Sequence, residues 1–281
     1  MIAAKKTDLL AIEENPLILP ASCLFQIDTK NDIDFDAYAS ALFEAGIILL
    51  DLGFDNPDAS IMTTIVEHLG TIDTHDGKGM VIWDVKYDAN VDQDKGTRSL
   101  TTKKFPIHTD ASFEEPPPQY VALYVVAEDS LGGGITQLID GRQILQHLSR
   151  EAISVLQTKA FKFRVPQEFI KNKAYIEASI LNGEGNFRYR QEVLILDDCT
   201  PQELQAIGEL ELLLANKSLI KSIFLKTGTI IIFDNGRFLH GRTKVRDKNR
   251  HLKRLRFQAK QTRFGVDCET YVYRKESGCL G

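Results

Sequence analysis

Apolar residues recur along the first third of the chain with two different periods. Helical spacing over residues 34 to 46, closed by Gly46, predicts an amphipathic helix. The continuous apolar run that follows, 47 to 53, predicts a buried strand. Residues 59 to 70 return to the helical period and end at Gly70, which predicts a second helix.

The remaining periodic segments are mostly strands. Residues 120 to 129 are rich in β-forming side chains, and 134 to 149 predict a strand that runs into a helix. A further helix is expected over 200 to 216, and strands over 228 to 235 and 252 to 260. Short strands with helices toward the ends and in insertions indicate an α+β protein with a β-sandwich or jelly-roll core. Periodicity alone leaves the topology open.

The chain shows no internal repeat, low-complexity tract or linker, so a single domain over 1–281 is expected. The polar segment 93 to 105 is interpreted as a mobile loop or lid. A hydrophobic content of 43% in 281 residues is enough for a sizeable core. The net charge of -5 and the lack of a long basic run argue against nucleic acid as a partner.

The N-terminus and the cysteines bear on location. Charges interrupt the first twenty residues, so no signal peptide is expected, and no apolar stretch is long enough for a membrane span. The four cysteines lack CxxC spacing, which favours reduced thiols in a cytoplasmic protein over a disulfide frame or a zinc site. They are Cys23, Cys199, Cys268 and Cys279.

Candidate chemistry begins at the stretch "FPIHTD". In an extended segment His108 and Asp110 point to the same face, where they form either half of a metal site or only a polar strand edge. A third donor, His240, follows the apolar strand "TIIIFDN" after a short turn. Two histidines and one carboxylate form the facial triad of non-haem Fe(II) oxygenases. An H-x-D triplet alone is weak evidence, because it occurs often by chance.

The wider pattern is more specific. The segments "HTDASFEEPPP", "GGGITQLIDG" and "FDNGRFLHGR" occur in the order and approximate spacing of one family. With them the chain resembles the taurine dioxygenase/clavaminate synthase family of Fe(II)- and 2-oxoglutarate-dependent oxygenases. The likeness runs from about "AGIILLDLGF" to "RLRFQ" and implies a double-stranded β-helix (jelly-roll) core with flanking helices.

The resemblance implies roles for particular residues. His108, Asp110 and His240 would bind iron. Thr136 and Arg250 would bind the distal carboxylate of 2-oxoglutarate, and Arg254 its C1 carboxylate or the substrate. The shared strand parity of Arg250 and Arg254 agrees with this, although Arg256 has the same parity and is a rival. Without the distal histidine, a solvated basic edge strand would be the better interpretation.

The implied reaction uses Fe(II), 2-oxoglutarate and dioxygen. The aspartate ligand favours hydroxylation of an unactivated C–H bond over halogenation, and leaves desaturation or ring formation open. Family substrates are small polar or anionic molecules, so an amino acid or a derivative of one is the expected substrate. The sequence does not decide whether the protein forms a homo-oligomer. The candidate substrate-binding residues are Trp83, Ser112, Phe113 and Arg254, with Tyr87, Arg188 and Arg190 as further pocket candidates. Trp83 is equally interpretable as a core aromatic, and Arg188 and Arg190 as members of an exposed edge strand.

Two other classes of function compete. One is a non-catalytic jelly-roll binding protein, against which the triad and the arginines argue. The other is a zinc hydrolase, which would leave Thr136 and the arginine pair without a role. A weak visible charge-transfer band with anaerobic Fe(II) and 2-oxoglutarate would favour the oxygenase over both.

Overall fold

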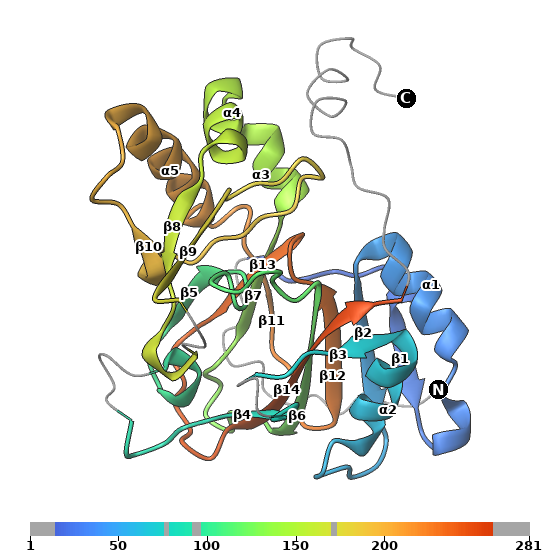
Figure 1. Cartoon of the computed structure of the whole chain (residues 1–281). Coiled ribbons are helices and arrows are strands. Elements are labelled where there is room, and N and C mark those ends of the chain that lie inside the picture. Colours follow the sequence, from blue (N-terminus) through green and yellow to red (C-terminus); the bar gives the residue numbers. More distant parts are fainter. Residues whose placement is uncertain (1–14, 76–78, 92–96, 170–172, 261–281) are drawn as a thin grey trace.

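The computed structural model describes residues 15–75, 79–91, 97–169 and 173–260. Figure 1 shows strands in the middle of the molecule, with α1 and α2 on one side and α3, α4 and α5 on the other. The fold is therefore a mixed α+β arrangement, as the sequence predicts. No helix within the described ranges is long and apolar enough to cross a membrane.

The largest sheet has seven strands in the order β1-β2-β12-β6-β14-β3, with β4 also paired to β14. Only the β1–β2 pair is parallel. The strands of this sheet are β1 (Leu24–Ile27), β2 (Ile47–Leu52), β3 (Gly70–Ile72), β4 (Trp83–Lys86), β6 (Tyr120–Ala127), β12 (Thr229–Asp234) and β14 (His251–Ala259).

A second sheet has four antiparallel strands in the order β11-β7-β13-β5. Its strands are β5 (Phe105–His108), β7 (Thr136–Asp140), β11 (Lys221–Ile223) and β13 (Phe238–Arg242). A third sheet, with order β10-β8-β9, consists of β8 (Phe161–Arg164), β9 (Tyr175–Ala178) and β10 (Leu194–Ile195).

The period of two in β12 explains how the layers pack. Ile231 and Phe233 join a buried cluster that also contains Leu138 of β7 and Phe238 of β13, so this cluster lies between the two larger sheets. Ile230 and Ile232 point the other way, into the cluster formed with α1 and α2. A third cluster covers the outer face of the four-stranded sheet, where Ile139 and Leu239 pack with residues of α3, α4 and α5.

The helices begin and end where local chemistry predicts. The Asp34 side chain caps α1, and Gly46 ends it in the left-handed conformation at φ 74°. Thr200 and Glu203 form a capping box at the start of α5. The α-helices are α1 (Phe35–Ala45), α2 (Ser60–Leu69), α3 (Gly141–His147), α4 (Arg150–Thr158) and α5 (Pro201–Leu214). Short 3-10 helices are η1 (Ala21–Cys23), η2 (Lys30–Asp32), η3 (Arg98–Leu100), η4 (Gln167–Phe169) and η5 (Gln191–Val193).

The structure confirms the predicted helices and strands with three differences. The helix expected up to residue 149 ends at His147, and Ser149 caps a separate helix, α4. Residues 93–96 of the expected loop lie outside the described residues, and η3 lies within the remainder. The chain turns at 235–237 after β12, and His240 then lies inside β13, a strand that the periodic segments did not predict.

Candidate metal centre

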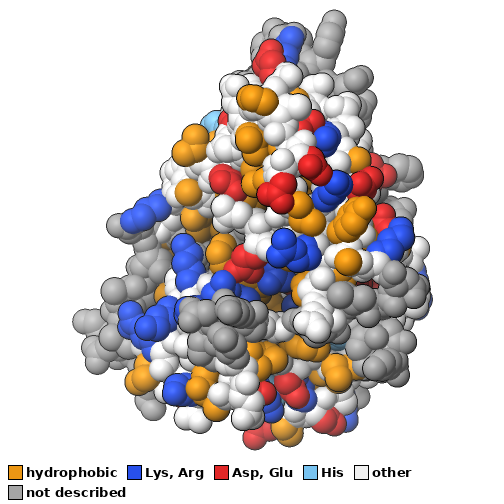
Figure 2. All heavy atoms as spheres, turned by 60° about the vertical axis from the view of Figure 1, so that its left-hand side comes forward, with side chains coloured by type: hydrophobic (Ala, Val, Ile, Leu, Met, Phe, Trp, Pro, Cys, Tyr) orange, Lys and Arg blue, Asp and Glu red, His pale blue; other side chains and the backbone are white. Residues whose placement is uncertain are grey.

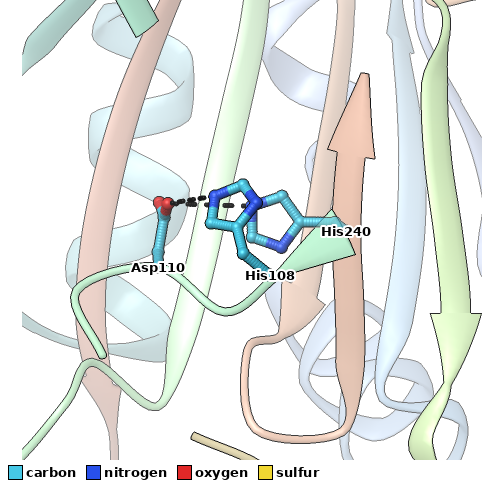
Figure 3. A group of neighbouring side chains, drawn as sticks. All are labelled: His108, Asp110 and His240. Carbon is cyan, nitrogen blue, oxygen red and sulfur yellow. Dashed lines mark ion pairs between the residues drawn. The ribbon is translucent and has the colours of Figure 1, made fainter. Parts of the chain in front are cut away.

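Three buried side chains from two distant parts of the sequence converge between the two larger sheets (Figure 3). His108 is the last residue of β5, Asp110 follows it by two, and His240 lies opposite His108 in the β5–β13 register. One donor atom from each of the three lies within 4.8 Å of the other two. Asp110 Oδ1 is 3.4 Å from His108 Nε2 and 3.7 Å from His240 Nε2.

A glycine allows β5 and β13 to approach closely enough for this convergence. A Cβ at Gly241 would lie 2.6 Å from the carbonyl oxygen of Phe105, closer than real Cβ atoms come. The β5–β13 register is irregular just beyond His240, where Arg242 lies opposite Phe105. The residue after the distal histidine therefore has to be small for the two imidazoles to face one site.

His108 is oriented as a metal ligand should be. Its Nδ1 lies 2.8 Å from the carbonyl oxygen of Pro106, to which it donates in the tautomer that leaves Nε2 with a lone pair. The ring stacks on Phe105 at 3.8 Å between centroids. Burial, with the neighbouring His240, lowers the pKa of His108 to about 4, so the imidazole is neutral near pH 7.

The backbone of Asp110 is fixed by Asn235, the residue after β12. The Asp110 N–H donates to Asn235 Oδ1 (2.7 Å), and Asn235 Nδ2 donates to the Asp110 carbonyl (3.1 Å). The same Nδ2 also donates to the carbonyl of Pro118 (3.0 Å). Ala111 then turns the chain with φ 49°, a conformation uncommon for a residue other than glycine. Both ligand-bearing segments are thus tied together by one buried amide.

The carboxylate of Asp110 is paired with a cation. Arg254 Nη1 donates to Asp110 Oδ2 at 2.8 Å, which leaves Oδ1 facing the two histidines. Burial raises the pKa of the Asp110 carboxyl, but the charge of Arg254 and the two adjacent histidines outweigh it and hold the pKa well below its usual range. Asp110 is therefore ionised near neutral pH.

These three residues fit Fe(II). A neutral imidazole, a second imidazole and an ionised carboxylate on one side of a site are the donor set of non-haem iron oxygenases. Within the described residues, buried His108 Nε2 makes no hydrogen bond, as expected of an atom that serves a metal. The triad is the one group of metal-ligating side chains found in the part of the chain that the structure describes.

A cavity extends from the triad toward Thr136 and Arg250. Thr136 begins β7 and Arg250 directly precedes β14, so the cavity lies between the two larger sheets. Its lining consists of Val85, Ser99, Phe105, His108, Asp110, Leu123, Thr136, His240, Gly241, Arg242, Arg250, Leu252 and Arg254. The side chains expected to hold the metal and the co-substrate carboxylate therefore share one space.

Arg250 is buried and packed against the glycine turn that precedes Thr136. A Cβ at Gly134, whose φ is 60°, would lie 2.5 Å from Arg250 Nε. Burial lowers the pKa of Arg250 to about 10, so the guanidinium remains charged near pH 7. A buried cation beside a hydroxyl is suited to bind a carboxylate.

Arg250, Arg254 and Arg256, which share one strand parity in the sequence, do not all face the cavity in the structure. Arg250 and Arg254 both line the cavity, as their shared parity predicts. Arg256 does not, because it pairs with Glu114 (3.1 Å) and donates to the carbonyl of Thr74 (2.8 Å). Arg254 contacts Asp110, and its buried Nε makes no hydrogen bond within the described residues, so this N–H remains available to a ligand.

Of the expected substrate-binding residues, Arg254 lines the cavity and the other three do not. The cavity lining does not include Trp83, Ser112 or Phe113. Trp83 Nε1 donates a hydrogen bond to Ser99, and Ser99 does line the cavity. Trp83 packs near His75 and Phe169. Ser112 is fully buried, and its hydroxyl has no hydrogen-bond partner among the described residues.

Arg188 and Arg190, the two further pocket candidates, do not lie on the exposed edge strand that the sequence left open as an alternative. Both are half-buried and lie outside any strand. Arg188 donates to the carbonyls of Ser112 (3.2 Å) and Glu114 (2.8 Å), so it supports the metal-binding loop. Arg190 lies over the ring of Phe105, 5.1 Å from its centroid. Tyr87 lies under the amine of Lys248, 4.6 Å from Nζ, and is not part of the cavity lining.

Sequence reasoning missed two residues that shape the site. Asn235 stands in the quoted "FDNGRF" segment, where an asparagine after a buried strand suggests only a turn. Arg242 is buried and donates to the backbone carbonyls of Arg98 (3.0 Å), Thr101 (2.7 Å) and Lys103 (2.6 Å). It therefore anchors the segment around η3 beside the cavity. Its place two residues after His240, on the same strand face, was the available signal.

Comparisons with known proteins agree with this geometry. Residues 18–256 match the family model described as Taurine catabolism dioxygenase TauD, TfdA family. No curated protein gives a significant match. A structure of asparagine oxygenase in complex with Fe(II), 2S,3S-3-hydroxyasparagine and succinate matches with a TM-score of 0.68 and 18% identity, over 80% of this chain and 81% of that one.

A structure of the non-heme iron oxygenase OrfP with Fe, succinate and (3S)-hydroxy-L-Arg has a TM-score of 0.64 and 16% identity, over 79% of this chain and 80% of that one. OrfP with Fe and alpha-ketoglutaric acid matches at 0.65 and 16%, over 80% and 79%. At these identities the likeness is one of fold. The family match covers most of the chain, so the protein belongs to the TauD/TfdA family and is an oxygenase that depends on Fe(II), 2-oxoglutarate and dioxygen.

Proposed function

We propose that the protein hydroxylates an unactivated C–H bond of a small polar substrate, an amino acid or a derivative of one. The observation that carries this proposal is the single cavity that joins the triad to Arg250 and Thr136. The structural neighbours that hold hydroxylated asparagine and arginine support the substrate class. The proposal treats residues 1–281 as one domain with a double-stranded β-helix core, formed by the facing seven- and four-stranded sheets.

Each side chain has a role in this proposal. His108, Asp110 and His240 hold the iron, with Oδ1 of Asp110 and Nε2 of His108 as donors. Thr136 and Arg250 bind the distal carboxylate of 2-oxoglutarate. When bound, iron and 2-oxoglutarate supply the oxidising chemistry, in which dioxygen converts 2-oxoglutarate to succinate and carbon dioxide. The buried walls of the cavity exclude bulk water from the reacting groups.

Arg254 has two tasks in the proposal. Its Nη1 keeps Asp110 ionised and oriented, as the 2.8 Å contact indicates. The unpaired Nε is free to donate to the carboxylate of the substrate or to C1 of 2-oxoglutarate. Trp83, which contacts η3 through Ser99, and Ser112 and Phe113 in the loop after Asp110 remain proposed substrate contacts. In this proposal the reactants are small molecules. Cys23 and Cys199 are free thiols, which supports the proposed location in the cytoplasm.

Kinetic titration of 2-oxoglutarate tests the assignment of the co-substrate residues. Arg250→Ala should raise the apparent requirement for 2-oxoglutarate by orders of magnitude, because the buried carboxylate of 2-oxoglutarate would lose its paired cation. Thr136→Ala removes a neutral donor to a charged acceptor and should cost about ten- to a hundredfold. Arg254→Ala should damage turnover and the coupling of succinate release to substrate at least as much as co-substrate affinity. If Arg250→Ala bound 2-oxoglutarate normally while Arg254→Ala did not, Arg254 would be the anchor.

A further inference from the structure

Residues 188–190 run directly beside the metal-binding loop. The N–H of Thr109, the residue between the two ligands, donates to the carbonyl of Tyr189 (2.7 Å), and the Tyr189 N–H donates to Thr109 Oγ1 (2.9 Å). The buried Tyr189 side chain points toward α5, where its hydroxyl donates to Glu211 (2.8 Å). Arg190 has an extended backbone, so its side chain leaves on the other side, where it lies over the ring of Phe105.

One aromatic ring separates the Arg190 guanidinium from a metal ligand. Its Cζ lies 5.1 Å from the centroid of the Phe105 ring, and that ring stacks on His108. A positive charge of this chain therefore lies one aromatic ring away from the metal centre, on the side of Arg190.

Arg190 shares a single carboxylate with another arginine. Its Nε and Nη2 donate to Oε2 of Glu192 at 3.3 and 3.0 Å. Arg98 donates to the other oxygen, Oε1, from Nε at 3.1 Å and from Nη2 at 2.5 Å. Two guanidinium groups thus face one carboxylate, which leaves one positive charge in excess. Because each arginine uses its own oxygen, Arg190 can exchange its partner while Arg98 keeps Glu192.

The three side chains remain partly open to solvent, with side-chain exposures of 16% for Arg190, 20% for Arg98 and 30% for Glu192. A group entering from solvent can reach them without disrupting the core. Figure 2 shows Lys and Arg side chains around a hollow in the face that it presents, with acidic side chains among them. At the cluster itself two arginines face the single carboxylate of Glu192. The local charge favours an anion there and disfavours a cation.

We propose that the substrate is an amino acid with an acidic side chain, whose carboxylate binds Arg190 in place of Oε2 of Glu192. This inference rests on the proposed function. A carboxylate meets the planar guanidinium with two parallel hydrogen bonds and balances the excess charge. An arginine side chain, as in the hydroxy-L-Arg complex of OrfP, would bring a further cation to the same place and is disfavoured.

Matched substrates test the inference with the wild-type protein. Substrate-stimulated succinate release is measured with L-aspartate against L-asparagine, L-glutamate against L-glutamine, and L-arginine. In the pair that is turned over, the acid should have a KM at least about tenfold below that of its amide, from the charge-assisted hydrogen bonds. L-Arginine should be the poorest of the five.

Two variants move the KM of the acid in opposite directions. Arg190→Gln should raise it about ten- to a hundredfold and leave the KM of the amide unchanged, which abolishes the preference. Glu192→Gln should lower the KM of the acid, because the competing charge is removed. Arg164→Gln, at an exposed arginine of β8, is the matched control and should keep the wild-type preference. A general loss of structure would affect acid and amide alike.

Preference for the amide or for L-arginine, or a lack of response to both acids, would overturn the inference. Retention of the acid preference in Arg190→Gln would do the same. In these cases the visible band with Fe(II) and 2-oxoglutarate would still appear, and the proposed oxygenase function would stand. Absence of both the band and any succinate release would instead refute the proposed function, and the inference with it.

Discussion

Asp110 is held from two directions that act on different parts of the residue. Arg254 pairs with one oxygen of its carboxylate, and Asn235 fixes its backbone N–H and carbonyl. The carboxylate therefore has little freedom to rotate away from the two histidines. A ligand held in this way needs little reordering when the metal binds.

Asn235→Ala should weaken metal binding although residue 235 is not a ligand. The substitution leaves the buried N–H of Asp110 and the carbonyls of Asp110 and Pro118 without this partner. We expect a loss of about 2 kcal/mol or more in the free energy of unfolding and a ten- to hundredfold lower Fe(II) affinity, roughly the range for such supporting residues. Chemical denaturation and anaerobic Fe(II) titration measure the two effects. Asn90→Ala, at an exposed asparagine, is the control; equal Fe(II) affinity in both variants would contradict the role of Asn235.

His75 predicts how the stability of the metal-free protein depends on pH. Burial, with the charges of Arg254 and Arg256, lowers its pKa to about 2 in the folded state. The unfolded chain binds a proton near pH 6.5 and the folded chain does not, so this contribution is complete above pH 6.5 and is lost as pH falls below it. His75→Gln should reduce the loss of unfolding free energy between pH 7.5 and 5.5 by about 1.4 kcal/mol.

Urea denaturation at the two pH values checks this expectation, with the metal removed by a chelator. His68→Gln is the control, since His68 is exposed on α2. If His75→Gln and the wild type lost the same free energy over this range, His75 would have to be protonated in the folded protein.

At the scale of elements, the turn before β7 and the start of β14 form one unit. Gly134 lies against the Arg250 guanidinium, and Asp129 accepts hydrogen bonds from the backbone N–H groups of Arg246 and Asp247 in the loop that leads into β14. The glycine turn therefore positions the arginine that is proposed to bind 2-oxoglutarate.

Gly134→Ala should raise the KM for 2-oxoglutarate more than about tenfold, because the new Cβ displaces a guanidinium that makes charged hydrogen bonds. The positive φ of residue 134 adds a smaller cost in stability. Steady-state kinetics with 2-oxoglutarate as the varied reactant separates KM from kcat. Gly183→Ala, where a Cβ meets nothing within 4 Å, should behave like the wild type. A change in kcat alone would argue against displacement of Arg250.

At the scale of the whole molecule, the sequence predicts features that depend on local patterns better than features that depend on contacts between distant segments. The strand over 228–235 and the end of the first helix at Gly46 follow from local patterns, and the structure confirms both. The parity of β14 predicted that Arg250 and Arg254 share the cavity. Family spacing brought His108 and His240 into one hypothesis, and the register of β5 and β13 places them opposite each other.

Other features were out of reach because they depend on pairings between distant segments. Nothing local to Arg254 indicates that it pairs with Asp110, 144 residues away. Likewise, the exclusion of Arg256 depends on Glu114, and the position of Arg190 depends on the contact between Tyr189 and Thr109. Such contacts follow from how the sheets stack, which periodicity does not determine.

The most direct test of the central claim is an anaerobic titration of Fe(II) into the protein with 2-oxoglutarate, followed by visible absorption. The wild type should develop a weak charge-transfer band that saturates at one iron per chain. His108→Ala, Asp110→Ala and His240→Ala should each lose it, while Arg250→Ala should regain it only at much higher 2-oxoglutarate. A band that persists unchanged in the three ligand variants would contradict the assignment of the triad as the iron site.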